Sequence, residues 1–141
     1  MQARGGELID ALTPNGLVAE RDGHPIGLVC WRLDPGEAGP TAEITCLVVA
    51  SGERGAGVGR RLLDAAAAAL RERRVRRAWL VTTNDNLAAL ALYQKAGFRL
   101  SALRPGAVAA ARRALKPGIP AIGEHEIPLR DELELGLDLT S

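Results

Sequence analysis

Apolar residues form a nearly continuous run in one part of the chain and recur at every fourth position in the next. These two patterns predict its central elements. Residues 42–50 are nearly all apolar and rich in β-branched side chains, which is typical of a buried strand. From residue 58 to about 73, apolar side chains recur every four positions, at Leu62, Ala66 and Leu70, which predicts the buried stripe of a helix. A strand, a short connection and a helix therefore form the centre of the chain.

The same patterns place further elements on both sides of this centre. Residues 17–20 and 26–33 predict a hairpin joined by residues 21–25, whereas residues 7–12 are open to two interpretations, a helical turn or a short extended piece. After the centre we expect a strand, a helix, a strand, an added helix, an irregular segment and a half-buried antiparallel closing strand, at residues 78–83, 87–95, 98–104, 105–116, 117–126 and 127–139. Strands that alternate with helices predict an α/β fold in which neighbouring strands are parallel.

Signals at both ends support the second helix. Asn84, Asp85 and Asn86 are residue types that cap helix N-termini. Gly97 suits the left-handed position that follows a helix C-terminus.

The connection between the central strand and its helix is rich in glycine. Residues 51–59 contain four glycines and Arg54, and Arg60 and Arg61 follow. Glycine lets the backbone approach a ligand closely, and the free N–H groups of a helix start attract anions. The pattern therefore indicates a phosphate site, although a tight connection with solvated arginines fits it equally well.

Two common phosphate motifs are excluded at this turn. A Walker loop requires Lys followed by Ser or Thr after its last glycine, but Arg60 and Arg61 occupy those positions. A dinucleotide fingerprint requires G-x-G-x-x-G, and the interval between Gly57 and Gly59 is too short for its last step.

Composition narrows the class of protein. The chain has 141 residues, a net charge of +1 and 25% charged residues, which suits one domain (1–141) without general attraction to nucleic acid or membranes. No apolar run approaches the length of a membrane span, and the first ten residues lack a signal-peptide core. Cys30 and Cys46 are too few for a disulfide framework or a metal site, so we expect buried free thiols in a bacterial cytoplasm and no metal.

Two motifs resemble those of one enzyme superfamily. R-x-x-G-x-G, from Arg54 to Gly59, follows an apolar strand and is similar to the pyrophosphate-binding turn of the GNAT N-acetyltransferases. N-x-x-A-x-x-x-Y-x-x-x-G-F, from Asn86 through Ala89 and Tyr93 to Phe98, resembles a second GNAT pattern. Asn86, Ala89 and Tyr93 would share one helix face, while a capping Asn86 and a packing Tyr93 are the structural alternative.

The resemblance implies a GNAT-like mixed central β-sheet flanked by helices, with a departure at the front. GNAT domains usually begin with a strand and one or two helices before the hairpin. Only residues 1–16 precede it here, so the first unit is expected to be truncated to a remnant. A homodimer in which a partner completes the fold is the expected assembly.

The resemblance also implies where acetyl-CoA binds as co-substrate. It would lie between the strands at 42–50 and 78–83, with its pantetheine arm along the main chain of Leu47, Val48 and Val49. The turn of Arg54, Gly55, Ala56, Gly57, Val58 and Gly59 would hold the pyrophosphate together with the side chain of Arg60, and Asn86, Ala89 and Tyr93 would line the thiol end.

Candidate catalytic groups follow from the same comparison. Tyr93 is expected to stabilise or protonate the departing thiolate. Glu43, eleven positions before Arg54, is the candidate base that deprotonates the acceptor amine, and an ion-paired carboxylate is its alternative. His125 and Glu124 are weaker candidates for the base.

Three functions compete at this stage. The first is an N-acetyltransferase acting on a primary amine of a small molecule or peptide by direct attack in a ternary complex. The second is a non-catalytic acyl-CoA-binding GNAT remnant. The third, a nucleic-acid binder, rests only on the five arginines of residues 71–77.

Overall fold

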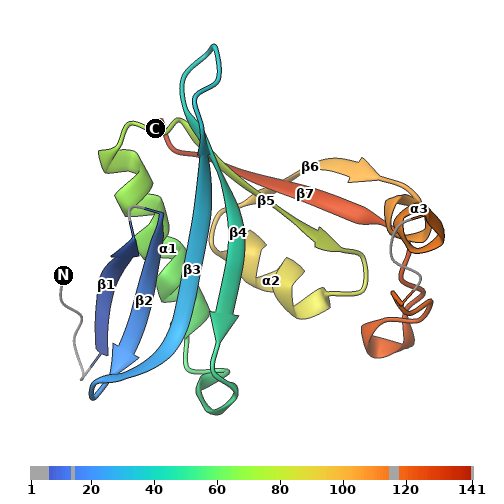
Figure 1. Cartoon of the computed structure of the whole chain (residues 1–141), viewed down its shortest axis with the longest axis horizontal. Helices are drawn as coiled ribbons and strands as arrows, with labels where there is room; N and C mark the ends of the chain where they lie inside the picture. Colours follow the sequence, from blue (N-terminus) through green and yellow to red (C-terminus); the bar gives the residue numbers. More distant parts are fainter. Residues whose placement is uncertain (1–6, 14, 115–117, 141) are drawn as a thin grey trace. The chain divides into compact units, whose positions relative to one another are not determined.

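The computed structural model describes residues 7–13, 15–114 and 118–140. The chain forms two compact units, one of Met1–Trp79 with Leu137–Ser141 and one of Leu80–Gly136. We describe each unit by itself, although β5 (Arg77–Thr83) and β7 (Glu132–Asp138) contribute residues to both. The elements alternate in the α/β manner that the sequence predicted, with their labels shown in Figure 1.

The first unit is built on four antiparallel strands that follow one another in the chain (Figure 1). They are β1 (Glu7–Thr13), β2 (Gly16–Arg21), β3 (His24–Asp34) and β4 (Thr41–Val49). The start of β5 then pairs parallel with β4, which makes the sheet mixed, as predicted. The hairpin between β2 and β3 turns on Asp22 and Gly23, both with positive φ, so its turn is tighter than the sequence suggested.

The segment before the hairpin is a strand, which decides between the two interpretations of residues 7–12. Strand β1 pairs antiparallel with β2, from Glu7 opposite Arg21 to Thr13 opposite Gly16. Only two residues separate β1 from β2, too few for a helix. The front of the chain therefore contains the strand expected of a GNAT domain, but the described residues contain no helix ahead of the hairpin.

Helix α1 (Val58–Glu72) lies against β2, β3 and β4, and its buried stripe is the predicted one. A side chain at Gly27 of β3 would meet the Leu62 Cδ1 atom at 2.8 Å and the Val58 Cγ1 atom at 3.1 Å. Glycine at this position therefore lets the helix approach the sheet closely. Strand β4 is less buried than its sequence predicted, because only its first half is shielded: Ala42 is 0% and Val48 55% exposed.

The second unit contains α2 (Leu87–Lys95), β6 (Arg99–Arg104), α3 (Ala107–Ala114), a 3-10 turn η2 (Glu124–Glu126) and β7. Its strand order is β5-β7-β6, with β7 antiparallel to β6. The expectation that β5 and β6 are parallel neighbours is wrong, because the closing strand lies between them. Its Leu135 is fully buried, whereas Leu100 and Leu103 of the edge strand β6 are 55% and 58% exposed. The central position of β7 thus buries its Leu135, while the edge position of β6 leaves its leucines exposed.

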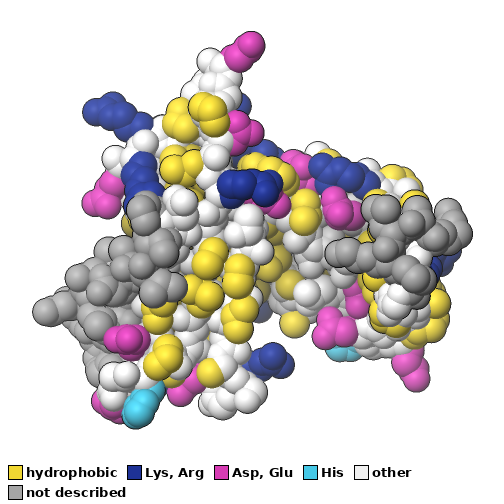
Figure 2. All heavy atoms as spheres, viewed as in Figure 1, with side chains coloured by type: hydrophobic (Ala, Val, Ile, Leu, Met, Phe, Trp, Pro, Cys, Tyr) yellow, Lys and Arg dark blue, Asp and Glu magenta, His cyan; other side chains and the backbone are white. Residues whose placement is uncertain are grey.

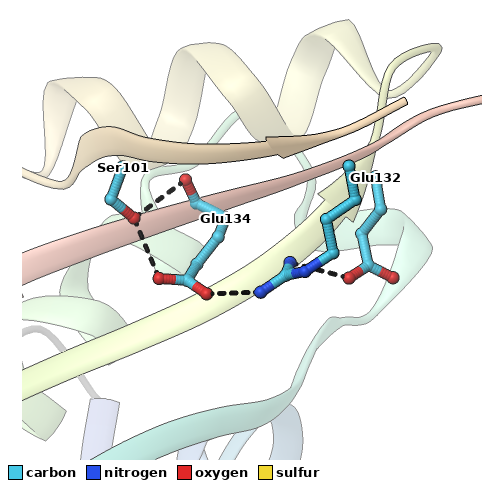
Figure 3. A network of polar contacts seen from close by, with 4 residues as sticks. Ser101, Glu132 and Glu134 are labelled. Atoms are coloured by element: carbon cyan, nitrogen blue, oxygen red, sulfur yellow. Dashed lines mark hydrogen bonds and ion pairs between the residues drawn. The ribbon is translucent and has the colours of Figure 1, made fainter. Parts of the chain in front are cut away.

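A polar network lies along β6 and β7 (Figure 3). The guanidinium of Arg104 donates to Glu132 at 2.9 Å and to Glu134 at 2.8 Å, and the Ser101 hydroxyl donates to Glu134 at 3.0 Å. These side chains join the two strands along an exposed surface, where each ion pair contributes little by itself.

The C-terminal end of α1 offers a test of stability. Arg74 has φ 61, and the N–H groups of Arg74 and Val75 donate to Arg71 O and Leu70 O, both at 3.0 Å. This is a Schellman motif whose left-handed position normally holds glycine. We expect Arg74→Gly to raise the free energy of unfolding by about 0.5–1 kcal/mol, because relief of backbone strain exceeds the added chain entropy.

Urea unfolding measures this change, and Arg71→Gly is its matched control. Arg71 is also exposed but lies inside the helix. The control removes the same charge and should lower stability by about 1 kcal/mol. Equal destabilisation by both variants would contradict the assignment of strain to Arg74.

Candidate functional site

The turn between β4 and α1 is a succession of tight bends that ends at the helix start. A 3-10 turn η1 (Ser51–Glu53) comes first, with the Glu53 N–H donating to Ala50 O at 2.8 Å. The Ala56 N–H then donates to Glu53 O at 3.2 Å. Gly55 and Gly57 have φ 84 and 81, and Gly57 is the N-cap of α1. The glycines are needed because other residues rarely adopt this backbone conformation.

The same turn is open on its outer side. A Cβ atom added at Gly52, Gly55 or Gly57 would meet nothing within 4 Å. The backbone there is therefore accessible to a ligand, unlike that of Gly27. No side chain caps the N-terminus of α1, because the N-cap residue is Gly57. The first helical hydrogen bond runs from the Arg61 N–H to Gly57 O at 3.1 Å. The N–H groups of the first turn consequently lack helical acceptors, an arrangement that suits an anion, and the phosphate site stays a prediction.

The arginines near this turn differ in how they are held. Arg60 forms an ion pair with Asp64 at 3.1 Å, one helical turn further on. Arg54 is exposed, and its guanidinium has no partner within the described ranges of the chain. Arg54 can thus turn towards an anion without losing a contact. Arg60 must first break its ion pair with Asp64.

The end of β4, where the pantetheine contacts are predicted, pairs differently from its start. The parallel pairs between β4 and β5 run only from Thr41 opposite Arg77 to Glu43 opposite Trp79. Beyond them, Leu47–Val49 pairs with β3 on one side. Among the described residues of the first unit, no strand pairs with the other edge of residues 47–49.

A β-bulge in β4 lies close to the point where the pairing of β4 with β5 ends. Cys46 lies opposite Cys30, but Ile44 lies opposite Trp31, so Thr45 is an extra residue. A bulge bends its strand and increases the local twist. It stands directly after the last pair with β5, where it redirects the end of β4. Nothing in the residue pattern of 42–50 signalled it.

Glu43 forms an ion pair, which was the alternative to its role as the catalytic base. Its carboxylate is 17% exposed and forms an ion pair with Arg32, its neighbour across β3. The ion pair holds the Glu43 carboxylate against Arg32 across the two strands. Its assignment as the general base stays a prediction.

The second motif lies in the second unit, on α2. Asn86 caps the helix as predicted, because its side-chain oxygen accepts from the Ala89 N–H at 3.2 Å. Tyr93 is half-buried, with its ring centroid 6.3 Å from that of Phe98. Burial raises the pKa of the Tyr93 phenol, so it keeps its proton at neutral pH.

The spacing Tyr93-x-x-x-Gly97-Phe98 also has a purely structural basis. The N–H groups of Gly97 and Phe98 donate to Gln94 O and Tyr93 O, both at 3.0 Å, and Gly97 has φ 99. This is another Schellman motif, and the contact between Tyr93 and Phe98 is the apolar pair that accompanies it. The motif thus fixes the position of the Tyr93 ring and leaves its hydroxyl for chemistry.

Asn84 and Asp85 do not cap α2, contrary to the prediction. The Asn84 side-chain oxygen accepts from the N–H groups of Arg130 and Asp131, both at 3.0 Å, and its amide donates to Pro128 O at 2.8 Å. These bonds explain why β7 begins at Glu132 instead of residue 127, since Pro128, Arg130 and Asp131 are bound to Asn84. No local pattern indicated such a distant partner.

Asp85 is a buried carboxylate, 5% exposed, that holds the loop before η2. One oxygen accepts from the Thr83 hydroxyl at 2.5 Å and the other from the Glu124 N–H at 2.9 Å. A side chain on Gly123 would come within 2.2 Å of that carboxylate. Burial alone would raise the pKa of Asp85, but the bonds from Thr83 and Glu124 outweigh it and lower the pKa from 3.8.

The lowered pKa of Asp85 predicts a pH dependence. Its contribution to stability is complete above the ordinary value of 3.8 and is lost as pH falls through the lower folded-state pKa. Asp85→Asn should cost about 1–3 kcal/mol at neutral pH, because one acceptor becomes a donor facing a donor. Urea unfolding between acid and neutral pH should show the difference between variant and wild type shrinking below 3.8; a constant difference would contradict it.

The remaining predicted residues are distributed as follows. His125 and Glu124, the weaker candidates for the base, are exposed on η2. Glu43, Leu47–Val49 and the glycine turn belong to the first unit, whereas Asn86, Ala89 and Tyr93 belong to the second. Among the described residues, no group of three His, Cys, Asp or Glu side chains is arranged to hold a metal, and no helix is long and apolar enough to cross a membrane.

Comparison with known families decides the classification. Residues 4–98 match the model of the Acetyltransferase (GNAT) family, and this range contains both motifs. The chain belongs to the GNAT family. The resemblance inferred from the glycine turn and from Asn86, Ala89 and Tyr93 is therefore confirmed.

Two relatives of this GNAT chain come from one bacterium. It is 49% identical over 83 residues to the uncharacterized protein YxbD of Bacillus subtilis strain 168, covering 59% of this chain and 52% of YxbD. It is 39% identical over 111 residues to the uncharacterized protein YdhI of the same strain, covering 79% of this chain and 65% of YdhI. The chain thus spans about half to two thirds of the length of these relatives.

A solved structure shows the same fold. It is a B. subtilis acetyltransferase in complex with CoA, with a TM-score of 0.74 and 24% identity over 87% of this GNAT chain and 75% of that one. The α/β architecture with a mixed sheet and flanking helices is therefore the GNAT fold.

Proposed function

We propose that this chain is an acetyl-CoA-dependent N-acetyltransferase that transfers the acetyl group directly to a primary amine. The observation that carries the proposal is the open glycine turn at the start of α1, with Gly55 and Gly57 at positive φ and no atom within 4 Å of either Cβ position. Membership of the GNAT family and the CoA complex of a similar structure support it.

In this proposal the first unit binds the nucleotide end of acetyl-CoA. The N–H groups of residues 54–59, apart from that of Ala56, which donates to Glu53 O, contact the pyrophosphate together with the Arg54 guanidinium. The helix dipole of α1 also favours the charge of the pyrophosphate. Arg60 joins them by leaving Asp64, an exposed pair that costs little to open. Main-chain groups of Leu47–Val49 pair with the amides of the pantetheine arm, and one N–H polarises the thioester carbonyl.

The chemical step requires a neutral amine and a stabilised thiolate. The amine nitrogen attacks the acetyl carbonyl, and CoA leaves as a thiolate. Tyr93 donates a hydrogen bond to that thiolate, for which its raised pKa is suitable because the phenol stays protonated. Glu43 accepts the proton of the amine, directly or through water, once its ion pair with Arg32 opens.

A direct assay tests the proposal. Purified protein is incubated with acetyl-CoA and a panel of primary amines comprising polyamines, amino acids, aminoglycosides, lysine peptides and peptides with free N-termini. The expected result is release of CoA thiol that depends on one class of amine, with a mass increase of one acetyl group on the acceptor. A protein that does not bind acetyl-CoA in calorimetry would contradict the proposal.

The ion pair of Glu43 favours a second candidate, a non-catalytic acyl-CoA-binding protein. A carboxylate held by Arg32 is not free to act as a base. Tight binding of acetyl-CoA without turnover on any amine of the panel would support this alternative. Arg32→Ala then discriminates further, because releasing Glu43 should raise the rate of an enzyme and leave a binding protein inactive.

A further inference from the structure

Two cysteines face each other across neighbouring strands of the first unit. Cys30 of β3 and Cys46 of β4 are directly opposite partners in the antiparallel register. Both are free thiols, and both are half-buried, not sealed in the core as the sequence predicted. The cysteine pair therefore combines a fixed spacing with access from solvent.

The pair lies on the face of the sheet that α1 does not cover. Gly27 faces α1, since a side chain there would meet Leu62 of that helix. Alternation along β3 then turns Val29 towards the helix and Cys30 away from it. In agreement, Val29 is fully buried and Cys30 is not. Figure 2 shows that hydrophobic side chains over β3 and β4 reach the molecular surface.

The spacing suits a covalent bond between the two sulfurs. Directly opposite residues of an antiparallel pair hold their Cβ atoms about 4.5–5.5 Å apart, and a disulfide needs about 3.5–4.5 Å. The bulge at Thr45 lies immediately beside Cys46. Because a bulge interrupts the ladder, it allows the small approach that remains.

The two thiols already interact. Burial, followed by an electrostatic contact and a hydrogen bond with Cys46, raises the pKa of Cys30. The raised pKa makes Cys30 a poorer nucleophile than an ordinary cysteine, and we assign the first attack to Cys46.

We propose that Cys30 and Cys46 form a dithiol site that low-molecular-weight disulfides, such as oxidised glutathione, convert to a cross-strand disulfide. The Cys46 thiolate attacks one sulfur of the oxidant, which forms a mixed disulfide and releases one thiol. Cys30 loses its proton to solvent and attacks the Cys46 sulfur, which forms the protein disulfide and releases the second thiol. Two protein thiols are oxidised, and one oxidant molecule is reduced to two thiols.

Mass spectrometry of the folded protein tests the proposal. The protein is equilibrated without oxygen in excess oxidised glutathione, its remaining thiols are blocked, and its intact mass and peptides are determined. We expect a product that lacks two hydrogen atoms, carries no glutathione and joins the peptides of Cys30 and Cys46. The oxidised protein should melt several degrees above the reduced one, because the bond closes a loop in the unfolded chain.

Single substitutions provide the matched controls. Cys30→Ser should stop at a stable glutathione adduct on Cys46, since no second thiol is present to displace it. Cys46→Ser should form its adduct more slowly, because burial, the largest cause of the raised pKa of Cys30, persists in this variant. The proposal is overturned if the wild type ends as a glutathione adduct, if its thiols stay reduced, or if the disulfide joins two chains instead of one.

Discussion

Gly57→Glu is expected to weaken binding of acetyl-CoA roughly 100-fold or more. Gly57 is the N-cap of α1, and the space around its Cβ position is open, so a side chain there projects to the side from which a ligand approaches. A glutamate at this position places a carboxylate among the N–H groups that would hold the pyrophosphate. It competes for the donors and repels the phosphates.

The hairpin turn provides an unusually close control. Gly23 has φ 82 against 81 for Gly57, and a Cβ atom at either position meets nothing within 4 Å. Gly23→Glu therefore introduces the same backbone strain and the same charge in the same unit. Both variants should lose about 1–2 kcal/mol of stability, but only Gly57→Glu should lose binding in calorimetry. Equal affinities of the two variants would show that the glycine turn is not the pyrophosphate site.

Tyr93→Phe is expected to reduce kcat for acetyl transfer by roughly 100-fold to 1000-fold, with little change in KM for acetyl-CoA. The substitution removes only the hydroxyl, and the ring contact with Phe98 that belongs to the helix C-cap remains. A loss confined to kcat would indicate a hydrogen bond made as the thiolate develops. Unchanged stability in urea unfolding is the control for the fold.

The pH profile sharpens the test of Tyr93. Burial raises its pKa from 10.0, so the phenol remains a donor through neutral and mildly alkaline pH. The wild-type rate should fall only as pH rises above that value, whereas Tyr93→Phe should lack this alkaline decline. Undiminished turnover by the variant would remove Tyr93 from the mechanism.

Local signals accounted for most elements of the chain. The helix at residues 87–95 agrees with α2 at both ends, because Asn86 and Gly97 supply its cap and its left-handed stop. The glycine turn was equally readable, since positive φ at Gly55 and Gly57 is a property of the residues themselves. Arg74 shows the limit of such signals, because an arginine occupies a position where glycine is the rule.

Distant contacts decided what the pattern could not. The closing strand lies between β5 and β6, which buries its Leu135 and leaves Leu100 and Leu103 of β6 exposed, an order that no local pattern indicated. Asn84 and Asp85 look like helix caps, yet they bind backbone about forty residues away. Glu43 pairs with Arg32 because the register of β3 and β4 sets them opposite each other.

The sequence by itself determined the family, the order of helices and strands after residue 16, and the residues of the glycine turn and of α2 that carry its motifs. These depend on the conformational preferences of neighbouring residues, which act over a few positions. Only the tertiary structure showed that Thr45 forms a bulge, that Glu43 pairs with Arg32, and that Cys30 and Cys46 lie opposite each other. Each of these depends on how two strands align, and register arises from packing across the sheet, not from either strand alone.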